Sequence, residues 1–581
     1  MIRTLGKHIK GYITASILTP LCMLAEVVVE NFIPLLMSVI IDSIGTGDLK
    51  KIYITSAIML LLALAGLITG FGGGVFGAKA STGFAKNLRK AMFANIQTFS
   101  FSNIDKFSTA GLVTRLTTDV TNLQNAYQMI LRMCMRAPAS MIIAMIMSFY
   151  INARLASIYL VAVILLGTCL FLIMRSATKY FEQAFPKYDE LNASVQENVS
   201  AIRVVKAYVR EDYETGKFHK ASENIYKIFC KAEENLSFNA PLMQLTVYSC
   251  ILLISWLGAK MIVGSSLSTG ELMSLLTYCM NILMSLMMLS MVFVMITMSL
   301  ASARRISEVL NEKSDLDNPE NPDFSIPDGS ITFDHVYFNY KKGAGEPVLS
   351  DINLSIQSGE TIGIIGGTGS AKTSLVNLIS RLYDVTDGSI KVGGKDVRSY
   401  DMETLRNEVA VVLQKNVLFS GTILDNLRWG DKNASEEECK RVCRLACADE
   451  FIDRMPDGYN TYIEQGGSNV SGGQKQRLCI ARALLKKPKV LILDDSTSAV
   501  DTATDAKIRK AFLTEIPETT KLIIAQRISS VQDADRIIVM ENGKVNGFGS
   551  HEELLKTNEI YREVYESQTG GDGDFDEKRG E

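Results

Sequence analysis

The chain has 581 residues, of which 47% are hydrophobic and 21% charged, and its formal net charge is -3. This length is too great for one ordinary domain, and the slightly positive mean hydropathy is unusual for a soluble protein. The small net charge identifies no partner class, and we expect no nucleic-acid partner. Long apolar stretches occupy residues 14–300, whereas the chain beyond residue 311 has the composition of a soluble α/β protein. A membrane half followed by a cytosolic half is therefore predicted.

The first half contains several stretches that could cross a membrane as helices. About 20 mostly apolar residues are needed to span a hydrocarbon core of ~30 Å. Six stretches qualify: 13–42, 54–78, 134–152, 155–176, 241–263 and 272–300. The first is too long for a cleaved signal peptide. Lys and Arg cluster before the first span and after the second and fourth, which predicts a cytosolic N-terminus, cytosolic long loops and a cytosolic C-terminal half. The polar loops are helix-like, so the helices should continue beyond the bilayer.

Two features of the predicted spans could concern a substrate. Glu26 and Glu30 are four residues apart and share a helix face. A carboxyl at membrane depth needs a cavity or a hydrogen-bonding neighbour, so this pair is either a polar contact for a substrate, such as a cationic one, or an interhelical hydrogen bond. Methionines of the last span fall within an arc of about 80°: Met280, Met284, Met287, Met291, Met295 and Met298. Thioethers suit differently shaped apolar ligands, and packing against helices or lipid is the alternative.

Ten cysteines are scattered through the chain without the spacing of a disulfide framework, which predicts reduced thiols. Cys439, Cys443 and Cys447 follow one another at four-residue steps. Their spacing matches no standard metal-binding pattern and no histidine is near, so we expect a packed helix face.

A segment rich in Pro, Asp and Asn at 311–330 predicts a linker. After it, "ETIGIIGGTGSAKTSLVNLISRLY" reads as a buried strand that passes through a glycine turn into a helix. The turn predicts a loop for the phosphates of ATP, made of Gly366, Gly367, Thr368, Gly369, Ser370, Ala371, Lys372, Thr373 and Ser374. Backbone amides would wrap the β-phosphate, Lys372 would reach the β and γ oxygens, and Thr373 would ligate Mg²⁺. Ala371 stands where a glycine is expected, and its Cβ could crowd the turn or the phosphate.

Further on, "NVSGGQKQRLCIARALL" precedes "KPKVLILDDSTSAVD". With these motifs the C-terminal half resembles the nucleotide-binding domain of an ABC transporter, and with six preceding spans the chain resembles an ABC exporter half-transporter over residues 1–565. The resemblance implies a membrane domain of six long helices at 1–310 and, after the linker, an α/β P-loop ATPase domain with a helical subdomain at 331–565. The acidic tail at 566–581 is predicted to be disordered.

The resemblance also implies roles for single residues. Tyr340 would stack on adenine, Asp494 would hold the metal through water, and Gln414 would contact Mg²⁺ and sense the membrane domain. Further residues would act across a dimer interface. The γ-phosphate held by the opposite chain would be bound by the signature residues Ser471, Gly472, Gly473 and Gln474, and the segment Ser498 to Asp501 would communicate between the two chains. Coupling helices that press on the nucleotide domains are expected near residues 108–116 and 207–218.

Two further positions, both expected near the γ-phosphate, depart from the family pattern. Asp495 stands where the glutamate that polarises the attacking water is usual, and Gln526 stands where a histidine is usual. A base displaced by about an ångström can lower the rate about a hundredfold, and glutamine cannot carry the proton or charge of a histidine. The pattern favours a site that binds ATP but hydrolyses it poorly.

With this asymmetry the chain resembles the heterodimeric bacterial exporters of the multidrug type, which implies an exporter in a bacterial cytoplasmic membrane that moves amphiphilic small molecules. This chain would be the degenerate-site half, and a second, non-identical half-transporter would carry the usual glutamate and histidine. A homodimeric lipid or peptide exporter, and an ATP-gated channel or regulatory subunit, are the alternatives.

Overall fold

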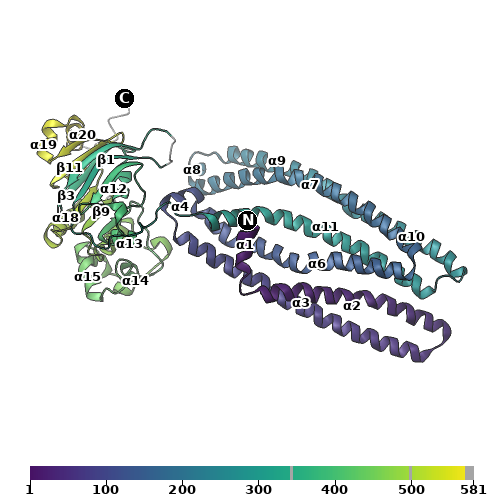
Figure 1. The fold of residues 1–581 in the computed structure, drawn as a ribbon. Helices are drawn as coiled ribbons and strands as arrows, with labels where there is room; N and C mark the ends of the chain where they lie inside the picture. Colours follow the sequence, from purple (N-terminus) through teal and green to yellow (C-terminus); the bar gives the residue numbers. More distant parts are fainter. Residues whose placement is uncertain (341–344, 496–499, 570–581) are drawn as a thin grey trace. The chain divides into compact units, whose positions relative to one another are not determined.

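The computed structural model describes residues 1–340, 345–495 and 500–569. The chain divides into two compact units (Figure 1). The membrane unit comprises Met1–Gln97 and Ser108–Glu312, and the sheet unit comprises Thr98–Phe107 together with the chain from Lys313 onward. The short segment Thr98–Phe107 thus groups with the C-terminal half, although it lies within residues 1–310, which were predicted to form the membrane domain.

The membrane unit is built from helices. Their bounds are α1 Ile2–Gly6, η1 Lys7–Ile9, α2 Ile13–Thr46, α3 Leu49–Gln97, α5 Thr109–Thr114, η2 Arg115–Asp119, α6 Val120–Ile151, α7 Ala153–Ser200, α8 Ile202–Ala207, α9 Glu211–Ser237, α10 Asn239–Val263 and α11 Thr269–Asn311. Within the described residues, six helical stretches are long and apolar enough to cross a membrane, which confirms the predicted spans. The 49 residues of α3 extend about 74 Å, more than twice the hydrocarbon thickness. The helices therefore continue beyond a bilayer, as predicted.

Local sequence sets where these helices begin and end. Gly47 ends α2 with a φ of +71°, a left-handed conformation that glycine adopts without strain. The Asn152 side chain accepts hydrogen bonds from the first backbone amides of α7. Ser268 and Glu271 form a capping box at the start of α11, and Asp42 of α2 accepts a hydrogen bond from Ser268 Oγ at 2.7 Å. These caps position the turns between the spans.

Glycines on one face of α3 allow α2 to approach closely. A Cβ added at Gly73 would lie 2.3 Å from Met23 Cε, and one added at Gly77 would lie 3.3 Å from Thr19 Cγ2. Small residues at such contacts let helix backbones approach within a membrane, where packing rather than water exclusion holds helices together. This face of α3 therefore supports the part of α2 that carries Glu26.

The sheet unit combines two main sheets with surrounding helices. Its strands are β1 Ile331–Phe338, β2 Leu349–Ile356, β3 Thr361–Gly366, β4 Asp387–Val392, β5 Lys395–Asp396, β6 Val409–Val412, β7 Gly421–Thr422, β8 Tyr462–Ile463, β9 Val490–Asp494, β10 Thr520–Ile524, β11 Arg536–Glu541 and β12 Lys544–Gly549. Its helices are α4 Phe101–Phe107, α12 Lys372–Ile379, η3 Val397–Ser399, α13 Met402–Glu408, α14 Ile423–Leu427, α15 Glu436–Leu445, α16 Asp449–Ile452, η4 Gly458–Asn460, η5 Gln465–Gly467, α17 Gly472–Leu484, α18 Thr502–Glu515, η6 Ile528–Ser530, α19 His551–Thr557 and α20 Glu559–Thr569.

The larger sheet has the strand order β12-β11-β3-β10-β9-β6, and the smaller, antiparallel sheet has the order β2-β1-β4-β5. β3, β9 and β10 are buried along their whole length, as expected for parallel strands that are covered on both faces. In the parallel register, Ile524 of β10 pairs with Ile364 of β3 and with Asp494 of β9. The carboxyl ends of these strands therefore meet at one edge, where ligands bind in open α/β sheets.

The three closely spaced cysteines lie in the core beside α15. Cys439 and Cys443 are completely buried, and Cys447 follows the end of the helix with a φ of +52° and is 8% exposed. All ten cysteines are free thiols, as predicted. In the part of the chain that the structure describes, no group of three or more His, Cys, Asp or Glu residues could hold a metal ion. The cysteines pack as predicted, although Cys447 lies just beyond the helix.

The C-terminal helix α20 runs to Thr569. The prediction of a disordered tail from residue 566 was therefore wrong for residues 566–569, because the apolar face of α20 packs on the core and carries the helix further. Residues 570–581 lie outside the described chain.

Candidate nucleotide site

The predicted phosphate loop connects β3 to α12 at the edge of the larger sheet. Lys372 Nζ donates hydrogen bonds to Gly366 O at 2.7 Å and to Gly367 O at 2.9 Å. Ser370 N donates to Gly367 O at 3.2 Å and closes the turn. The lysine ammonium thus lies against carbonyl oxygens of the loop, in the region where phosphate oxygens would offer a stronger acceptor.

The backbone of this loop is tightly constrained. A Cβ at Gly366 would lie 2.3 Å from Met540 O, so a side chain does not fit there. Gly369, which follows Thr368, has a φ of +82°, a left-handed conformation that glycine adopts without strain. Ala371, directly before α12, has a φ of +71° and a ψ of +24°. Because this left-handed conformation costs an L-residue about 1–2 kcal/mol, the alanine introduces backbone strain where glycine would have none.

Oxygen ligands suited to Mg²⁺ lie beside the loop. Thr373 Oγ1 donates to Asp494 Oδ1 at 3.1 Å, and Asp494 is 2% exposed at the end of β9. Burial raises the pKa of Asp494, and the Asp495 carboxylate adds to this effect, while the Thr373 hydroxyl and Lys372 oppose it. Gln414 follows β6, the neighbour of β9, and its side chain is exposed. Carboxylate, hydroxyl and amide oxygens are the donors Mg²⁺ prefers, so the three residues fit this ion.

The two atypical residues lie together. Gln526 Nε2 donates a hydrogen bond to Asp495 Oδ2 at 3.4 Å. The backbone of Asp495 is held on both sides: its N–H donates to Ile524 O at 3.2 Å, and its carbonyl accepts from Gln476 Nε2 at 3.5 Å. Asp495 also has a φ of +49°. The pair follows directly from the parallel register of β9 and β10, because each residue lies just beyond the end of its strand.

Tyr340, predicted to contact adenine, lies beside the phosphate-loop helix. Its side chain is 45% exposed, and its hydroxyl is 2.8 Å from Ser374 Oγ. Its ring makes an edge contact with Tyr383 at a centroid distance of 5.1 Å. An exposed aromatic face next to a phosphate loop is suited to stacking on a nucleobase.

The predicted signature residues begin α17. Ser471 Oγ accepts a hydrogen bond from Gln474 N at 3.3 Å, and Gln474 Oε1 accepts one from Ser471 N at 2.9 Å, which forms a capping box. Ser471 and Gly472 are exposed, and Gly473 is half-buried. This helix N-terminus is therefore accessible to an anion presented by a second chain.

The segment predicted to communicate across the dimer is described only in part, because Ser498 and Ala499 lie outside the described residues. Asp501 is the N-cap of α18, where its carboxylate accepts from Thr504 N at 2.9 Å. This backbone hydrogen bond is the largest influence on the Asp501 carboxyl and lowers its pKa.

In the membrane unit, the two glutamates of α2 share one arginine of α6. Arg136 Nη1 lies 2.6 Å from Glu26 Oε1, and Nη2 lies 2.8 Å from Glu30 Oε2. Within the described chain, Glu26 Oε2 is buried without a hydrogen-bond partner. A Cβ at Gly70 of α3 would lie 3.1 Å from Glu26 Oε1, so glycine makes room for the carboxylate. An interhelical contact is thus present, in which Arg136 pairs with both glutamates, and one buried carboxylate oxygen of Glu26 has no partner among the described residues.

The methionine stripe lies on an uncovered face of α11. Met280, Met284, Met287 and Met291 are between 43% and 61% exposed, and Met295 is half-buried. The side chain of Met298 lies outside the described residues. The stripe is therefore not a core contact of this chain and is accessible to lipid, a ligand or a second chain.

A short helix from the loop between the second and third spans packs on the sheet unit, to which it belongs. Tyr383 Oη donates to Asp105 Oδ2 of α4 at 2.9 Å, and the Phe101 and Tyr383 rings make an edge contact at 5.9 Å. Ser102 Oγ donates to Asp315 Oδ2 at 2.7 Å. The sequence placed the first coupling helix near 108–116, and α4 lies just before it. In the second predicted region, Tyr208 and Val209 are 75% and 81% exposed.

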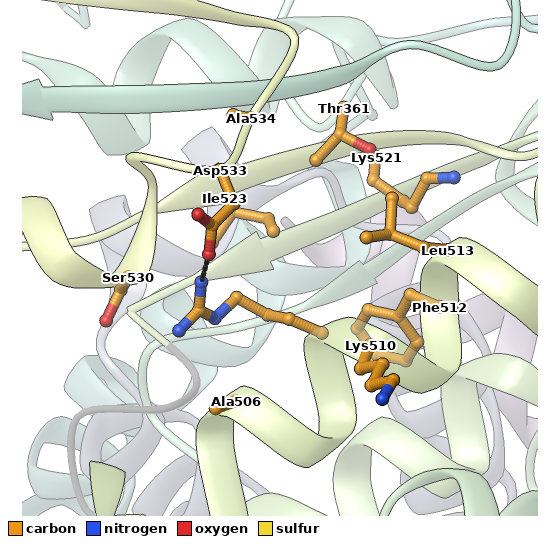
Figure 2. A pocket seen from close by; sticks show the side chains of 11 residues that line it. Thr361, Ala506, Lys510, Phe512, Leu513, Lys521, Ile523, Ser530, Asp533 and Ala534 are labelled. Atoms are coloured by element: carbon orange, nitrogen blue, oxygen red, sulfur yellow. Dashed lines mark hydrogen bonds and ion pairs between the residues drawn. The ribbon is translucent and has the colours of Figure 1, made fainter. Parts of the chain in front are cut away.

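A cavity of about 270 Å³ lies between α18, β10 and the chain around residues 530–534 (Figure 2). It is lined by Thr361, Ala506, Arg509, Lys510, Phe512, Leu513, Lys521, Ile523, Ser530, Asp533 and Ala534. None of the predicted nucleotide residues lines it, so it is separate from the phosphate loop.

Sequence reasoning missed several contacts of these residues. Arg136 could have been found, since an arginine within a predicted span needs a counter-charge at membrane depth. Three other contacts have no local sequence signal: that of Gln476 with Asp495, that of Tyr383 with α4, and that of Gln568 with the chain after Gln526. Their contacts depend on long-range packing.

Comparison with known proteins agrees with this geometry. The model of the ABC transporter transmembrane region matches residues 16–287, and that of the ABC transporter domain matches residues 349–498. The chain is 37% identical over 569 residues to YfiB, an uncharacterized ABC transporter ATP-binding protein of Bacillus subtilis, covering 97% of this chain and 98% of that protein. It is 34% identical over 484 residues to the ATP-dependent lipid A-core flippase of Desulfotalea psychrophila, covering 83% and 84% of the two chains.

A solved structure shows the same fold. A bacterial Atm1-family ABC exporter with ATP bound superposes with a TM-score of 0.80 at 23% identity, covering 98% of this chain and 99% of that chain. Six candidate spans precede the α/β domain with its phosphate loop, in one chain. The chain therefore belongs to the ABC transporter family, as a half-transporter with the exporter fold.

Proposed function

We propose that this chain is the degenerate-site subunit of a heterodimeric ABC exporter that moves amphiphilic compounds out of a bacterial cell. The contact between Asp495 and Gln526 carries the proposal. The aspartate side chain is shorter than that of glutamate by one C–C bond, roughly 1.5 Å, and a displacement of the base by about 1 Å can lower the rate about a hundredfold. The Gln526 amide also donates to this carboxylate and so competes with a water for the same acceptor.

Nucleotide binding is expected to remain. Lys372 would release the loop carbonyls and bind the β- and γ-phosphates, while Tyr340 would stack on the base. Thr373, Gln414 and Asp494 would hold Mg²⁺, which supplies neutralisation of phosphate charge. These residues bind and orient ATP, but this site lacks a well-placed base, so nucleotide would stay bound for many turnovers of the partner.

The signature segment supports a role in a second site. Ser471, Gly472, Gly473 and Gln474 retain the sequence expected for γ-phosphate binding, and the first two are exposed at the start of α17. Paired with a chain that carries the usual glutamate and histidine, this segment would complete a hydrolytic site. In a homodimer both sites would contain Asp495 and Gln526.

The proposed substrate path combines a charged point and an apolar surface. Glu26 retains an unpartnered buried oxygen beside Arg136, which suits a hydrogen-bond donor or a cation on the substrate. The exposed methionines of α11 suit an apolar body of variable shape.

The second candidate is a homodimeric lipid exporter, and the 34% identity to a lipid A-core flippase favours it. The Lys and Arg bias predicts that the N-terminus and the sheet unit face the cytosol.

ATPase activity in lipid, measured with the purified chain alone and with candidate partners, tests the proposal. We expect little turnover by the chain alone and restored turnover with a partner that carries glutamate and histidine. Ser471→Ala in this chain should abolish the restored activity. Ordinary turnover by the chain alone would support the homodimeric pump instead.

A further inference from the structure

The side chain of Gln568, near the end of α20, bridges the backbone that follows the sensor strand β10. Gln568 Oε1 accepts a hydrogen bond from Ile528 N at 2.8 Å, and Gln568 Nε2 donates one to Gln526 O at 3.1 Å. We infer that Gln568 is a positioning residue that holds this backbone, and through it aims the Gln526 side chain at Asp495. The inference rests on the proposed function in one respect, namely that residue 526 faces the nucleotide.

The backbone at this point has left the sheet. β10 ends at Ile524, and Ala525 N still donates to Ile364 O of β3 at 3.2 Å. Beyond it, the Gln568 amide supplies an acceptor for one backbone N–H and a donor for one backbone carbonyl, as a neighbouring strand would. Glutamine can do this because its amide contains both groups. The two bonds lie on either side of Arg527 and fix the direction in which residue 526 leaves the strand.

Helix α20 is well anchored, so Gln568 is held firmly. Tyr561 is completely buried, and its hydroxyl lies 2.7 Å from His551 Nδ1. Val564 and Tyr565 pack on the hydrophobic core. Residues 561, 564, 565 and 568 recur at helical spacing and share a face, which explains why Gln568 points inward and is itself half-buried.

The other end of the same segment is fixed by α18. Arg509 Nη1 lies 3.0 Å from Asp533 Oδ2, and a dashed line marks this ion pair at the labelled Asp533 in Figure 2. Ser530 Oγ donates to Asp505 Oδ2 at 3.2 Å. Residues 526–533 are therefore held between α18 on one side and α20 on the other. Gln568 makes the restraint nearest to residue 526, and its loss would free the end that reaches the phosphate site.

The test uses the full-length chain with Asp495→Glu and Gln526→His, in which hydrolysis is expected to be measurable. The histidine keeps the main-chain carbonyl that Gln568 binds. Into this background we would introduce Gln568→Met, which has similar length and helix propensity but no amide. The control is Glu563→Gln on an exposed turn of the same helix. Hydrogen exchange at Ile528 and steady-state ATPase parameters are measured for each.

We expect Gln568→Met to speed exchange of the Ile528 amide about tenfold or more and to lower kcat about tenfold or more, with KM for ATP nearly unchanged, because phosphate-loop and adenine contacts are untouched. Glu563→Gln should change neither. A merely structural role of Gln568 would lower the melting temperature without this separation of kcat from KM.

The outcomes separate the inference from the proposed function. Unchanged exchange at Ile528 in Gln568→Met overturns the inference whatever the ATPase rate, and so does faster exchange with unchanged kcat. If the background chain itself hydrolyses no ATP, the proposed cause of the degenerate site fails. In that case hydrogen exchange of the Ile528 amide is compared between the unmodified chain and a chain that carries Gln568→Met alone. This comparison decides whether Gln568 holds the segment.

Discussion

Lengthening the side chain at position 495 tests the cause assigned to the degenerate site. In Asp495→Glu the backbone should stay in place, because the N–H of residue 495 is bonded to Ile524 O and its carbonyl accepts from Gln476. The carboxylate then advances by roughly 1.5 Å, the length of one C–C bond. Recovering a misplacement of about 1 Å should raise kcat about a hundredfold, equivalent to about 2.7 kcal/mol of barrier.

The backbone conformation at this position introduces a secondary effect. Residue 495 has a φ of +49°, a region in which Asp and Asn are more frequent than Glu. Asp495→Glu should therefore lower stability by about 1 kcal/mol, visible as a small decrease in melting temperature. Asp495→Asn is the matched control, because asparagine tolerates this conformation but provides no carboxylate.

The assay is phosphate release by the purified full-length chain in lipid, with kcat and KM determined for wild type, Asp495→Glu, Asp495→Asn and Asp495→Glu with Gln526→His. KM should change little, because the phosphate loop is untouched. The double variant should be the fastest, since the histidine can carry a charge near the γ-phosphate. A wild-type chain that already turns over at an ordinary rate, or an Asp495→Glu variant within about threefold of it, would refute the reasoning.

Four further substitutions test other contacts of the structure. Ala371→Gly removes the strain at a φ of +71° and should stabilise the sheet unit by up to about 1 kcal/mol after the extra flexibility of glycine in the unfolded chain is subtracted; a lower melting temperature would contradict this. Lys372→Met should lower ATP affinity at least about tenfold without unfolding the chain, and retained binding of a fluorescent ATP analogue would show that another residue binds the phosphates. Arg136→Met leaves two carboxylates uncompensated and should cost about 3 kcal/mol or more, whereas Glu30→Gln, at a side chain 48% exposed, should cost under about 1 kcal/mol. Equal melting temperatures of the two variants in detergent would argue against a stabilising ion pair.

Several features of this protein were predictable because they depend on residues close together in the sequence. The spans follow from runs of apolar residues that only a helix can carry through a bilayer. The phosphate loop follows from glycines between a buried strand and a helix. Ser471 and Gln474 form the capping box that begins α17, which is a pattern of four residues. The order of these motifs was sufficient to place the chain in its family.

Other features depend on contacts between distant segments. Glu26 and Arg136 are 110 positions apart, so which charge neutralises the glutamates depended on how α2 packs against α6. Ala371 was suspect from its identity alone, but its left-handed backbone is a property of the folded loop. The Asp495–Gln526 contact required the parallel register of β9 and β10. Helix α4 groups with the sheet unit through contacts with Tyr383 and Asp315, and α20 reaches past residue 565 because its apolar face packs on the core.

The sequence by itself determined which chemical groups this protein has and which helices, strands and turns carry them, because those depend on local periodicity and local backbone preference. Only the tertiary structure decided which of the groups meet. Gln568 contacts Gln526 and Ile528, which lie 42 and 40 positions away in the sequence. Such contacts leave no local sequence pattern, because the hydrogen-bonding partners come together only when distant segments of the chain pack.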